Sequence, residues 1–266
     1  MNPTCKKRLG AIRSETMKVV AQEEIAPAIF ELVLEGEMVE AMRAGQFLHL
    51  RVPDDAHLLR RPISISSINK DKKQCHLIYR IEGAGTAIFS TLRQGDTLDV
   101  MGPQGNGFDL SDLDNQSQVL LVGGGIGVPP LLEVAKELHA RGVTVVTVLG
   151  FATKDAVILE TELAQYGQVF VTTDDGSYSI KGNVSVVIND LDSQFDAVYS
   201  CGAPGMMKYI NQRFYDHPRA YLSLESRMAC GMGACYACVL KVPDSETVSQ
   251  RVCEDGPVFR TGTVVL

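Results

Sequence analysis

The first part of the chain consists of short apolar segments separated by turn-forming polar residues. The apolar segments, each rich in Val, Ile and Leu, are Met17–Gln22, Ile29–Leu34, Gln46–Val52, Ile63–Ile68, Cys75–Ile81 and Thr97–Gly102. Turn residues such as Pro53-Asp54-Asp55 and Gln94-Gly95-Asp96 separate them. Strands at such intervals are typical of an antiparallel barrel or sandwich. A short helix at Gly85–Leu92 is expected to interrupt them.

The pattern changes after the Asp- and Ser-rich segment Ser111–Ser117, which is interpreted as a linker. Apolar strands are expected at Gln118–Val122, Val143–Leu149, Gln168–Thr173, Ala197–Ser200 and Ala220–Leu224. Helices are expected between them at Pro129–Ala140, Thr161–Tyr166, Val184–Asp190 and Met206–Tyr215. Strands that alternate with helices predict a parallel sheet that is covered on both faces.

A loop begins at Ser226, and the apolar segments Val239–Val242 and Val258–Leu266 that follow it predict a compact tail. The sequence therefore indicates an α+β multidomain protein. Its predicted parts are an N-terminal antiparallel β-barrel at 15–112, an α/β parallel-sheet nucleotide-binding domain at 113–225 and a small cysteine-rich C-terminal segment at 226–266. The length of 266 residues fits about two domains with room for a small third.

Composition narrows the class of protein. The net charge of −7 argues against nucleic-acid binding, which requires clustered basic surface. No apolar stretch is long enough to span a bilayer, and no apolar run follows the basic residues 6–8 as it would in a signal peptide. Among the seven cysteines, Cys5, Cys75 and Cys201 are widely separated, which suits a reducing compartment rather than a disulfide framework. A cytoplasmic protein is expected.

Four cysteines lie close together in the last part of the sequence. Cys230, Cys235, Cys238 and Cys253 have the spacing Cys-x4-Cys-x2-Cys-x14-Cys. The first three match the spacing of plant-type [2Fe–2S] ligands, and Gly231 and Gly233 allow a loop to curl closely around sulfur. The alternative is a structural zinc site, which usually pairs its cysteines as two short knuckles, whereas only one such pair is present here. The spacing favours the iron–sulfur cluster, and the protein is expected to move electrons.

A glycine-rich turn follows the first strand of the predicted parallel sheet and precedes a helix. Its glycines are Gly123, Gly124, Gly125 and Gly127. Glycines let a backbone approach a pyrophosphate, and the start of the next helix offers free amides. Pro129 or Pro130 suits the first helical turn. We expect a nicotinamide dinucleotide to bind here, and the alternative is a plain tight turn.

Cys201 ends another predicted strand and begins the segment Cys201-Gly202-Ala203-Pro204-Gly205. Open α/β sheets bind their ligands at the carboxyl ends of strands. One interpretation makes Cys201 a catalytic residue that contacts the edge of the nicotinamide. The other makes it a buried cysteine that packs like a small apolar residue. The sequence supports both equally.

Three short segments of the predicted barrel carry groups suited to a second dinucleotide. These residues are Arg61, Pro62, Ile63 and Ser64, then Ile78, Tyr79 and Arg80, then Gly85 and Thr86. An arginine holds a phosphate, a serine hydroxyl reaches a flavin or ribitol oxygen, and the Tyr79 ring offers a plane for stacking. A nicotinamide exchanges two electrons as a hydride, whereas the cluster holds one. An intermediary with a half-reduced state is therefore required, and flavin is the usual solution.

With these motifs in this order, the chain resembles the ferredoxin–NADP⁺ reductase superfamily. More narrowly, it resembles the electron-transfer subunits of NAD-dependent (class 1B) dihydroorotate dehydrogenases, most specifically at 224–235 with Cys238 and Cys253. The resemblance implies FAD at the barrel residues named above, NAD at the Gly123 turn and near Cys201, and a [2Fe–2S] cluster on the four cysteines. It also implies a partner, an FMN-containing catalytic subunit, in a heterotetramer of two copies each. Electrons from dihydroorotate then pass through FMN, cluster and FAD to NAD⁺.

Other kinds of protein share parts of this pattern. Related subunits of sulfide dehydrogenases, sulfhydrogenases and ferredoxin:NADP oxidoreductases have the same layout, a free-standing reductase would serve a soluble carrier, and a non-catalytic module would hold zinc. A partner-dependent subunit is favoured because no acid–base pair for an organic substrate is evident. The scattered histidines, each expected to be a surface or strand residue, are His49, His57, His76, His139 and His217. Residues 228–240 carry no charged side chain, which suits docking on another protein.

Overall fold

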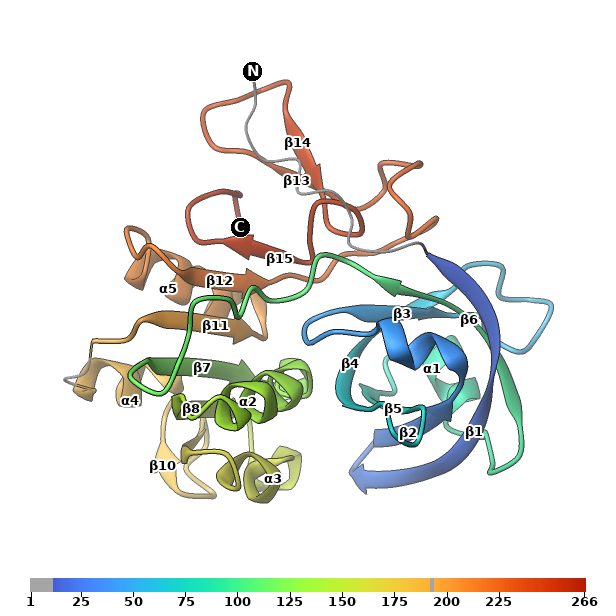
Figure 1. Cartoon of the computed structure of the whole chain (residues 1–266), viewed down its shortest axis with the longest axis horizontal. Helices are drawn as coiled ribbons and strands as arrows, with labels where there is room; N and C mark the ends of the chain where they lie inside the picture. The colour runs from blue at the N-terminus through green and yellow to red at the C-terminus, as the bar shows by residue number, and fades with distance from the viewer. Residues whose placement is uncertain (1–11, 192–193) are drawn as a thin grey trace.

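The computed structural model describes residues 12–191 and 194–266. Cys5 and the basic residues 6–8 lie outside the described residues. Figure 1 shows a barrel and an open sheet side by side, with a small hairpin segment above the junction between them. The predicted fold class is confirmed in this arrangement.

A closed antiparallel barrel is formed in the order β1-β2-β5-β4-β3-β6. Its strands are β1 (Arg13–Ala26), β2 (Ile29–Glu35), β3 (Phe47–Leu50), β4 (Arg61–Asn69), β5 (Gln74–Arg80) and β6 (Thr97–Gln104). Apolar side chains such as Met17, Leu32 and Leu48 fill its interior and are 0% exposed. A short 3-10 helix lies at Glu37–Ala41, and α1 (Ala84–Phe89) ends before the predicted limit at Leu92. All the predicted barrel strands are present.

The second part is a mostly parallel sheet with helices. Within the described residues the sheet has seven strands in the order β10-β9-β8-β7-β11-β12-β15. They are β7 (Gln118–Gly124), β8 (Thr144–Phe151), β9 (Gln168–Thr173), β10 (Ile180–Lys181), β11 (Ala197–Cys201), β12 (Ala220–Ser223) and β15 (Val258–Arg260). The helices are α2 (Pro130–Ala140), α3 (Glu160–Ala164), α4 (Val184–Asp190) and α5 (Pro204–Arg213), with 3-10 turns at Gly125–Gly127 and Lys154–Ala156. In the described part of the chain, no helix is long and apolar enough to cross a membrane.

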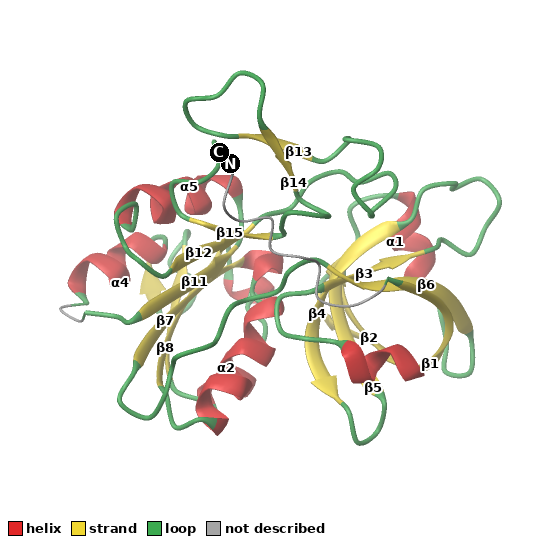
Figure 2. Ribbon diagram, turned by 45° about the horizontal axis from the view of Figure 1, so that its top comes forward, coloured by secondary structure: helices red, strands yellow, loops and turns green. Residues whose placement is uncertain are grey.

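The strand β7 shows why both faces of this sheet are covered. Val119 and Leu121 belong to one apolar cluster together with side chains of α2. Leu120 and Val122 belong to a second cluster together with side chains of α4 and α5. Because successive side chains of a strand point to opposite faces, an uninterrupted apolar strand requires cover on both sides. Figure 2 shows α2 on one side of the sheet and α4 and α5 on the other.

The cysteine-rich segment lies between β12 and β15 and contains the antiparallel hairpin of β13 (Val239–Lys241) and β14 (Ser249–Arg251). The predicted compact tail at Val258–Leu266 is corrected by the structure. Its strand β15 pairs antiparallel with β12, so it is an edge strand of the nucleotide sheet. The segment is therefore attached to the sheet at both of its ends. The strands β10 and β14 were not expected, because the first has two residues and the second, Ser-Gln-Arg, is polar.

Buried polar contacts join the barrel to the sheet. Glu133 on α2 is 5% exposed and accepts hydrogen bonds from the amide of Ile68 at 2.8 Å and from the Ser67 hydroxyl at 3.2 Å. Lys136 donates to the Ile68 carbonyl at 2.7 Å and pairs with Glu133 at 3.2 Å. These contacts fix α2 against β4, so the first helix after the glycine-rich turn also positions the barrel.

Candidate functional site

A cavity of about 690 Å³ lies where the barrel, the sheet and the cysteine-rich segment meet. All of the predicted flavin-binding residues line it: Arg61, Pro62, Ile63, Ser64, Ile78, Tyr79, Arg80, Gly85 and Thr86. Ile126 of the glycine-rich turn and residues 223–228, ahead of the first cluster cysteine, complete its wall. Segments far apart in the sequence thus share one cavity, whose volume suits a large cofactor.

Arg61 and Gly85 lie against each other in this cavity. A Cβ at Gly85 would come within 2.7 Å of Arg61 Nε, so the absence of a side chain lets the guanidinium rest on the start of α1. Thr86 holds this turn, because its hydroxyl accepts hydrogen bonds from the amides of Glu82 at 2.9 Å and Gly83 at 3.2 Å. A guanidinium placed beside a helix start is suited to a diphosphate.

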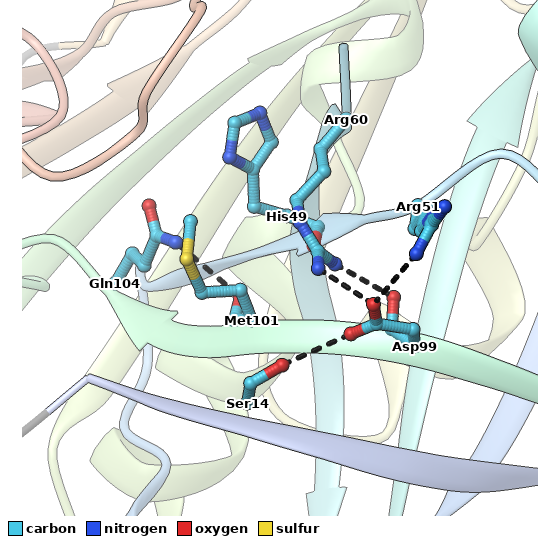
Figure 3. Close-up of polar contacts among 7 residues, drawn as sticks. All are labelled: Ser14, His49, Arg51, Arg60, Asp99, Met101 and Gln104. Carbon is cyan, nitrogen blue, oxygen red and sulfur yellow. Dashed lines mark hydrogen bonds and ion pairs between the residues drawn. The ribbon is translucent and has the colours of Figure 1, made fainter. Parts of the chain in front are cut away.

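The neighbouring Arg60 is used differently. It pairs with Asp99 at 2.7 Å and donates to the Asp99 carbonyl at 2.9 Å and the His49 carbonyl at 3.3 Å. Figure 3 shows Arg60 directed at Asp99, which Arg51 and Ser14 also contact. Arg60 therefore ties β3 to β6, and Arg61 is the arginine of this pair that is available to an anionic ligand.

The proposed role of the Tyr79 ring as a stacking platform needs correction. Tyr79 lines the cavity but is 3% exposed. Its ring stacks on Phe30 with centroids 6.0 Å apart and meets Phe89 edge-on at 6.1 Å. Its hydroxyl accepts a hydrogen bond from Gln22 at 2.8 Å, and burial raises its pKa to about 12. The ring is thus part of the barrel core, as an alternating strand residue on the inward face would be.

The glycine-rich turn lies beside the Cys201 segment. A Cβ at Gly127 would come within 2.5 Å of the Gly202 amide nitrogen, and one at Gly124 within 2.8 Å of Met206 Sδ. The strands β7 and β11 are neighbours, whereas β8 lies on the other side of β7. Successive strands are therefore added on one side of β7 up to β10 and on the other side from β11, and ligands of open α/β sheets bind at this topological switch point. The predicted strand before and helix after the turn are both present.

Cys201 is buried at the carboxyl end of β11 and is 1% exposed. Burial and the nearby Glu225 carboxylate raise the pKa of its thiol well above the ordinary range, while Ser223 opposes this rise. Ser223 and Glu225 line the cavity, but the Cys201 side chain does not. Cys201 therefore lies directly behind the residues of the cavity wall and is not itself exposed in the cavity.

Glu225 is a wall residue that the sequence analysis did not single out. Burial raises the pKa of its carboxyl above the ordinary value, and the nearby Glu82 adds to this effect while Arg80 opposes it. A carboxyl with a raised pKa in a cavity can hold a proton at a cofactor or substrate atom. Its position just ahead of the cluster motif was the only signal in the sequence.

The four cysteines of the cluster motif come together in pairs. The thiols of Cys230 and Cys235 interact with each other, as do those of Cys238 and Cys253. Such pairing fits a two-iron cluster, whose four thiolates are shared between two irons. In the part of the chain that the structure describes, no group of three or more His, Cys, Asp or Glu side chains surrounds a single ion site.

Backbone amides of the same loop point at sulfur. The Met232 amide donates to Cys230 Sγ at 3.4 Å, and the Gly233 amide donates to Cys253 Sγ at 3.2 Å. Gly231 and Gly233 have φ of 66° and 84°, which explains why the loop needs glycine there. Burial opposes ionisation of Cys230, but amide hydrogen bonds lower its pKa to about 7. Amide donors and a thiol that ionises readily suit a thiolate-held cluster.

Arg251 holds this loop from the hairpin side. It donates to the Gly233 carbonyl at 2.7 Å, pairs with Asp255 at 3.3 Å and lies 5.0 Å from the centroid of the Tyr236 ring. No local signal in the sequence indicates this role of Arg251, because its contacts join residues far apart along the chain. It stabilises the loop on both sides of the second cluster cysteine, from Gly233 to Tyr236.

The barrel with its cavity, the switch point beside it and the cysteine loop together define a flavoprotein of the ferredoxin–NADP⁺ reductase class. Family models agree with this assignment: residues 16–108 match an oxidoreductase FAD-binding domain. Residues 225–265 match the iron–sulfur cluster binding domain of dihydroorotate dehydrogenase B. The chain belongs to the family of electron transfer subunits of NAD⁺-dependent dihydroorotate dehydrogenase B.

Curated relatives support this membership over the whole length. A dihydroorotate dehydrogenase B (NAD⁺) electron transfer subunit of Streptococcus pneumoniae strain R6 is 94% identical over 255 residues, which are 96% of this chain and 100% of the relative. The subunit of the same name from Geobacillus thermodenitrificans is 52% identical over 257 residues, 96% of this chain and 100% of the relative. The zinc module considered above is set aside, because the matched domain is an iron–sulfur domain.

Solved structures agree with the fold. The structure of an NADH-dependent reduced ferredoxin-NADP oxidoreductase, described for flavin-based electron bifurcation, superposes with a TM-score of 0.84 at 30% identity, covering 94% of this chain and 90% of that one. A ferredoxin NADP⁺ reductase from Neisseria gonorrhoeae, with a TM-score of 0.65 at 19% identity, covers 80% and 94% and shows the fold alone. The chain is an oxidoreductase subunit whose cofactors are FAD and an iron–sulfur cluster, and its activity is linked to NAD.

Proposed function

We propose that this chain carries electrons between the FMN of a dihydroorotate dehydrogenase catalytic subunit and NAD⁺, with FAD and a [2Fe–2S] cluster as its cofactors. The dihydroorotate of pyrimidine biosynthesis is thereby oxidised to orotate. The relatives carry this activity in their names. The observation that carries the proposal is the shared cavity, whose wall includes the flavin motif of β4, Ile126 of the nucleotide turn and residues leading into the cluster loop.

Each cofactor has a set of residues suited to it. FAD is assigned to the nine barrel residues of the cavity, with Arg61 and Gly85 at its diphosphate. NAD is assigned to the glycines of the 123–127 turn, and Cys201 to the edge of the nicotinamide. The cluster is assigned to Cys230, Cys235, Cys238 and Cys253. FAD supplies the exchange between two-electron and one-electron chemistry, and the chain's own residues bind and orient it.

The segments serve these cofactors separately. We assign 15–112 to FAD, 113–225 to NAD and 226–266 to the cluster, although β15 of the last segment completes the nucleotide sheet. The matched ranges 16–108 and 225–265 support the outer two boundaries. Cys75 and Cys201, which lie outside the cluster motif, are buried free thiols, as is usual in a reducing compartment, and we therefore assign the protein to the cytoplasm.

The surface of the cluster segment is suited to a partner. Met232, Tyr236, Val239 and Val248 are 47%, 59%, 43% and 46% exposed. Apolar and aromatic side chains are enriched in the buried cores of interfaces, and charge is depleted there. We assign this surface to the FMN-containing catalytic subunit, in a heterotetramer with two copies of each chain.

Replacing one cluster ligand tests the proposed function. Cys238→Ser should remove the iron and acid-labile sulfide and leave FAD bound, because Cys238 does not line the cavity. NADH should still bleach the flavin absorbance, while reduction of the catalytic subunit's FMN by NADH falls to background. Cys75→Ala is the control, because Cys75 is also buried but lies in the barrel and outside the cluster motif. This variant should keep both flavin bleaching by NADH and reduction of FMN. Unchanged reduction of FMN in iron-free Cys238→Ser protein would contradict the proposal.

A further inference from the structure

Two polar side chains buried against the cluster loop have atoms that lack hydrogen-bond partners. His49 on β3 and Gln104 on β6 are both 0% exposed. Among the described residues, neither ring nitrogen of His49 has a hydrogen-bond partner, and Gln104 Oε1 also has none. The backbone of Arg60 lies close enough to influence the His49 ring, but no hydrogen bond of ordinary geometry forms between them. Buried polar atoms in folded proteins are normally paired, so these atoms indicate a missing partner.

Both side chains face the first glycine of the cluster loop. A Cβ built at Gly231 would lie 2.4 Å from His49 Nδ1 and 2.8 Å from Gln104 Oε1. Gly231 directly follows the ligand Cys230. Figure 3 shows the His49 ring standing away from the Arg60–Asp99 pair, with no dashed contact to any residue drawn.

The same strand connects this position to the flavin motif. His49 pairs with Pro62 across β3 and β4 and with Met101 across β3 and β6. Its carbonyl is held by Arg60 at 3.3 Å. Gln104 is also anchored, because its Nε2 donates to the Met101 carbonyl at 3.3 Å. One rigid barrel edge therefore connects the segment assigned to FAD with the loop assigned to the cluster.

We propose that His49 is a positioning residue for the cluster, donating one ring N–H to a sulfur atom on the Cys230 side, with Gln104 supporting the same edge. The proposal rests on the proposed function in that it requires the [2Fe–2S] cluster. Burial, followed by the nearby charge of Arg60, lowers the pKa of His49 to about 4, so the ring is neutral and carries one N–H donor. No proton moves in this arrangement.

The consequence is electrostatic. An electron added to the cluster increases the negative charge on sulfur, and a hydrogen bond to sulfur stabilises that charge. Hydrogen bonds to cluster sulfurs are among the factors that set the potential of such clusters. His49 is therefore expected to raise the reduction potential of the cluster, which favours reduction of the cluster by FMN and makes the reduced cluster a weaker donor to FAD.

The test compares two substitutions in the purified holoprotein, using a redox titration followed by electron paramagnetic resonance. His49→Leu removes the donor at similar volume and should lower the cluster potential by about 59 mV or more, a tenfold change in a one-electron equilibrium. His49→Gln keeps an N–H donor and should restore most of this shift. His76→Gln, at a histidine that contacts Glu31 at 2.8 Å on the outer barrel, is the control and should match the parent protein.

The outcomes separate cleanly. A His49→Leu protein with full iron and sulfide, an unchanged potential and an unchanged spectrum overturns the inference. If the His49→Leu protein holds no cluster, the His49→Gln protein decides the question. A His49→Gln protein with a cluster of parental potential supports the inference. A His49→Gln protein that fails to hold iron overturns it, because the retained N–H donor is then not sufficient. Absence of iron and sulfide from the parent protein would instead refute the proposed function.

Discussion

Gly85 lies against the guanidinium of Arg61, so that a Cβ at this glycine would come within 2.7 Å of Nε and 3.0 Å of Cζ. The two residues come from different segments of the barrel, β4 and the start of α1. Their contact, together with the hydrogen bond from the Arg61 guanidinium to the Leu59 carbonyl, sets the position of the arginine in the cavity. A glycine is needed at position 85 because a side chain there would collide with Arg61. Its backbone conformation does not require glycine, since its φ is not in the left-handed region.

Gly85→Ala should weaken FAD binding by about tenfold, equivalent to about 1.4 kcal/mol, because the added methyl group displaces the Arg61 guanidinium. The fold should persist, since the obstructing atoms belong to the end of a flexible side chain. Flavin content and the dissociation constant of FAD measure the effect. Gly83→Ala is the matched control, because it lies in the same loop but a Cβ there would have no neighbouring atom within 4 Å. Equal affinities for the two variants would contradict this role of Gly85.

Gly127→Ala should destabilise the protein by about 1–3 kcal/mol and weaken NADH binding, because its Cβ would strike the backbone of Cys201 and Gly202 within 2.6 Å. Backbone atoms cannot rotate away as a side chain can. Urea unfolding and NADH titration provide the two measurements. Gly205→Ala, in the first turn of α5 with open space at its Cβ, should neither destabilise the protein nor weaken NADH binding. A Gly127→Ala protein with parental stability would show that the two turns are further apart.

Glu133→Ala should lower the free energy of unfolding by about 2–4 kcal/mol, because a buried carboxylate that accepts two hydrogen bonds from β4 and pairs with Lys136 is lost. The substitution also leaves the Ile68 amide without its acceptor and Lys136 without its carboxylate partner, although Lys136 still donates to the Ile68 carbonyl. Chemical denaturation measures the change. Glu137→Gln on the same helix, which removes the charge of the partly exposed pair with Arg141 at 3.4 Å and keeps an oxygen acceptor, should cost about 0.5 kcal/mol. Similar losses of unfolding free energy in both variants would show that Glu133 does not hold α2 against β4.

Acid should weaken the fold through His49. Its pKa falls from 6.5 to about 4 on folding, so between these values the unfolded chain binds more protons than the native one. The contribution of neutral His49 to the free energy of unfolding is complete above pH 6.5 and is lost as the pH falls toward 4. Between pH 7 and 5 the loss should be about 2 kcal/mol. Urea midpoints of the parent and His49→Gln measure it, and parallel pH profiles would refute the prediction.

Local signals in the sequence were sufficient for much of the fold. The barrel strands, the turn from Gly123 to Gly127 and the helix Val184–Asp190 could be predicted, because each depends on neighbouring residues and their spacing. The cavity residues followed for the same reason, since they lie in short continuous motifs. The iron–sulfur segment was predicted from cysteine spacing alone.

The rest depends on contacts between distant residues. Nothing in Val258–Arg260 indicates that it pairs with β12, and nothing around His49 separates it from a histidine on a solvated strand. Tyr79 has an aromatic ring of the kind that can stack on a cofactor, but the pleat of β5 turns this ring inward toward Phe30. Tertiary packing decides all three cases.

The return of the chain to β12 through β15 constrains how this molecule works. A cofactor loop anchored at both ends has no hinge on which to swing, in contrast to carriers that shuttle on a flexible tether. We therefore expect turnover to depend on encounter with the redox partner and with nicotinamide rather than on a moving arm.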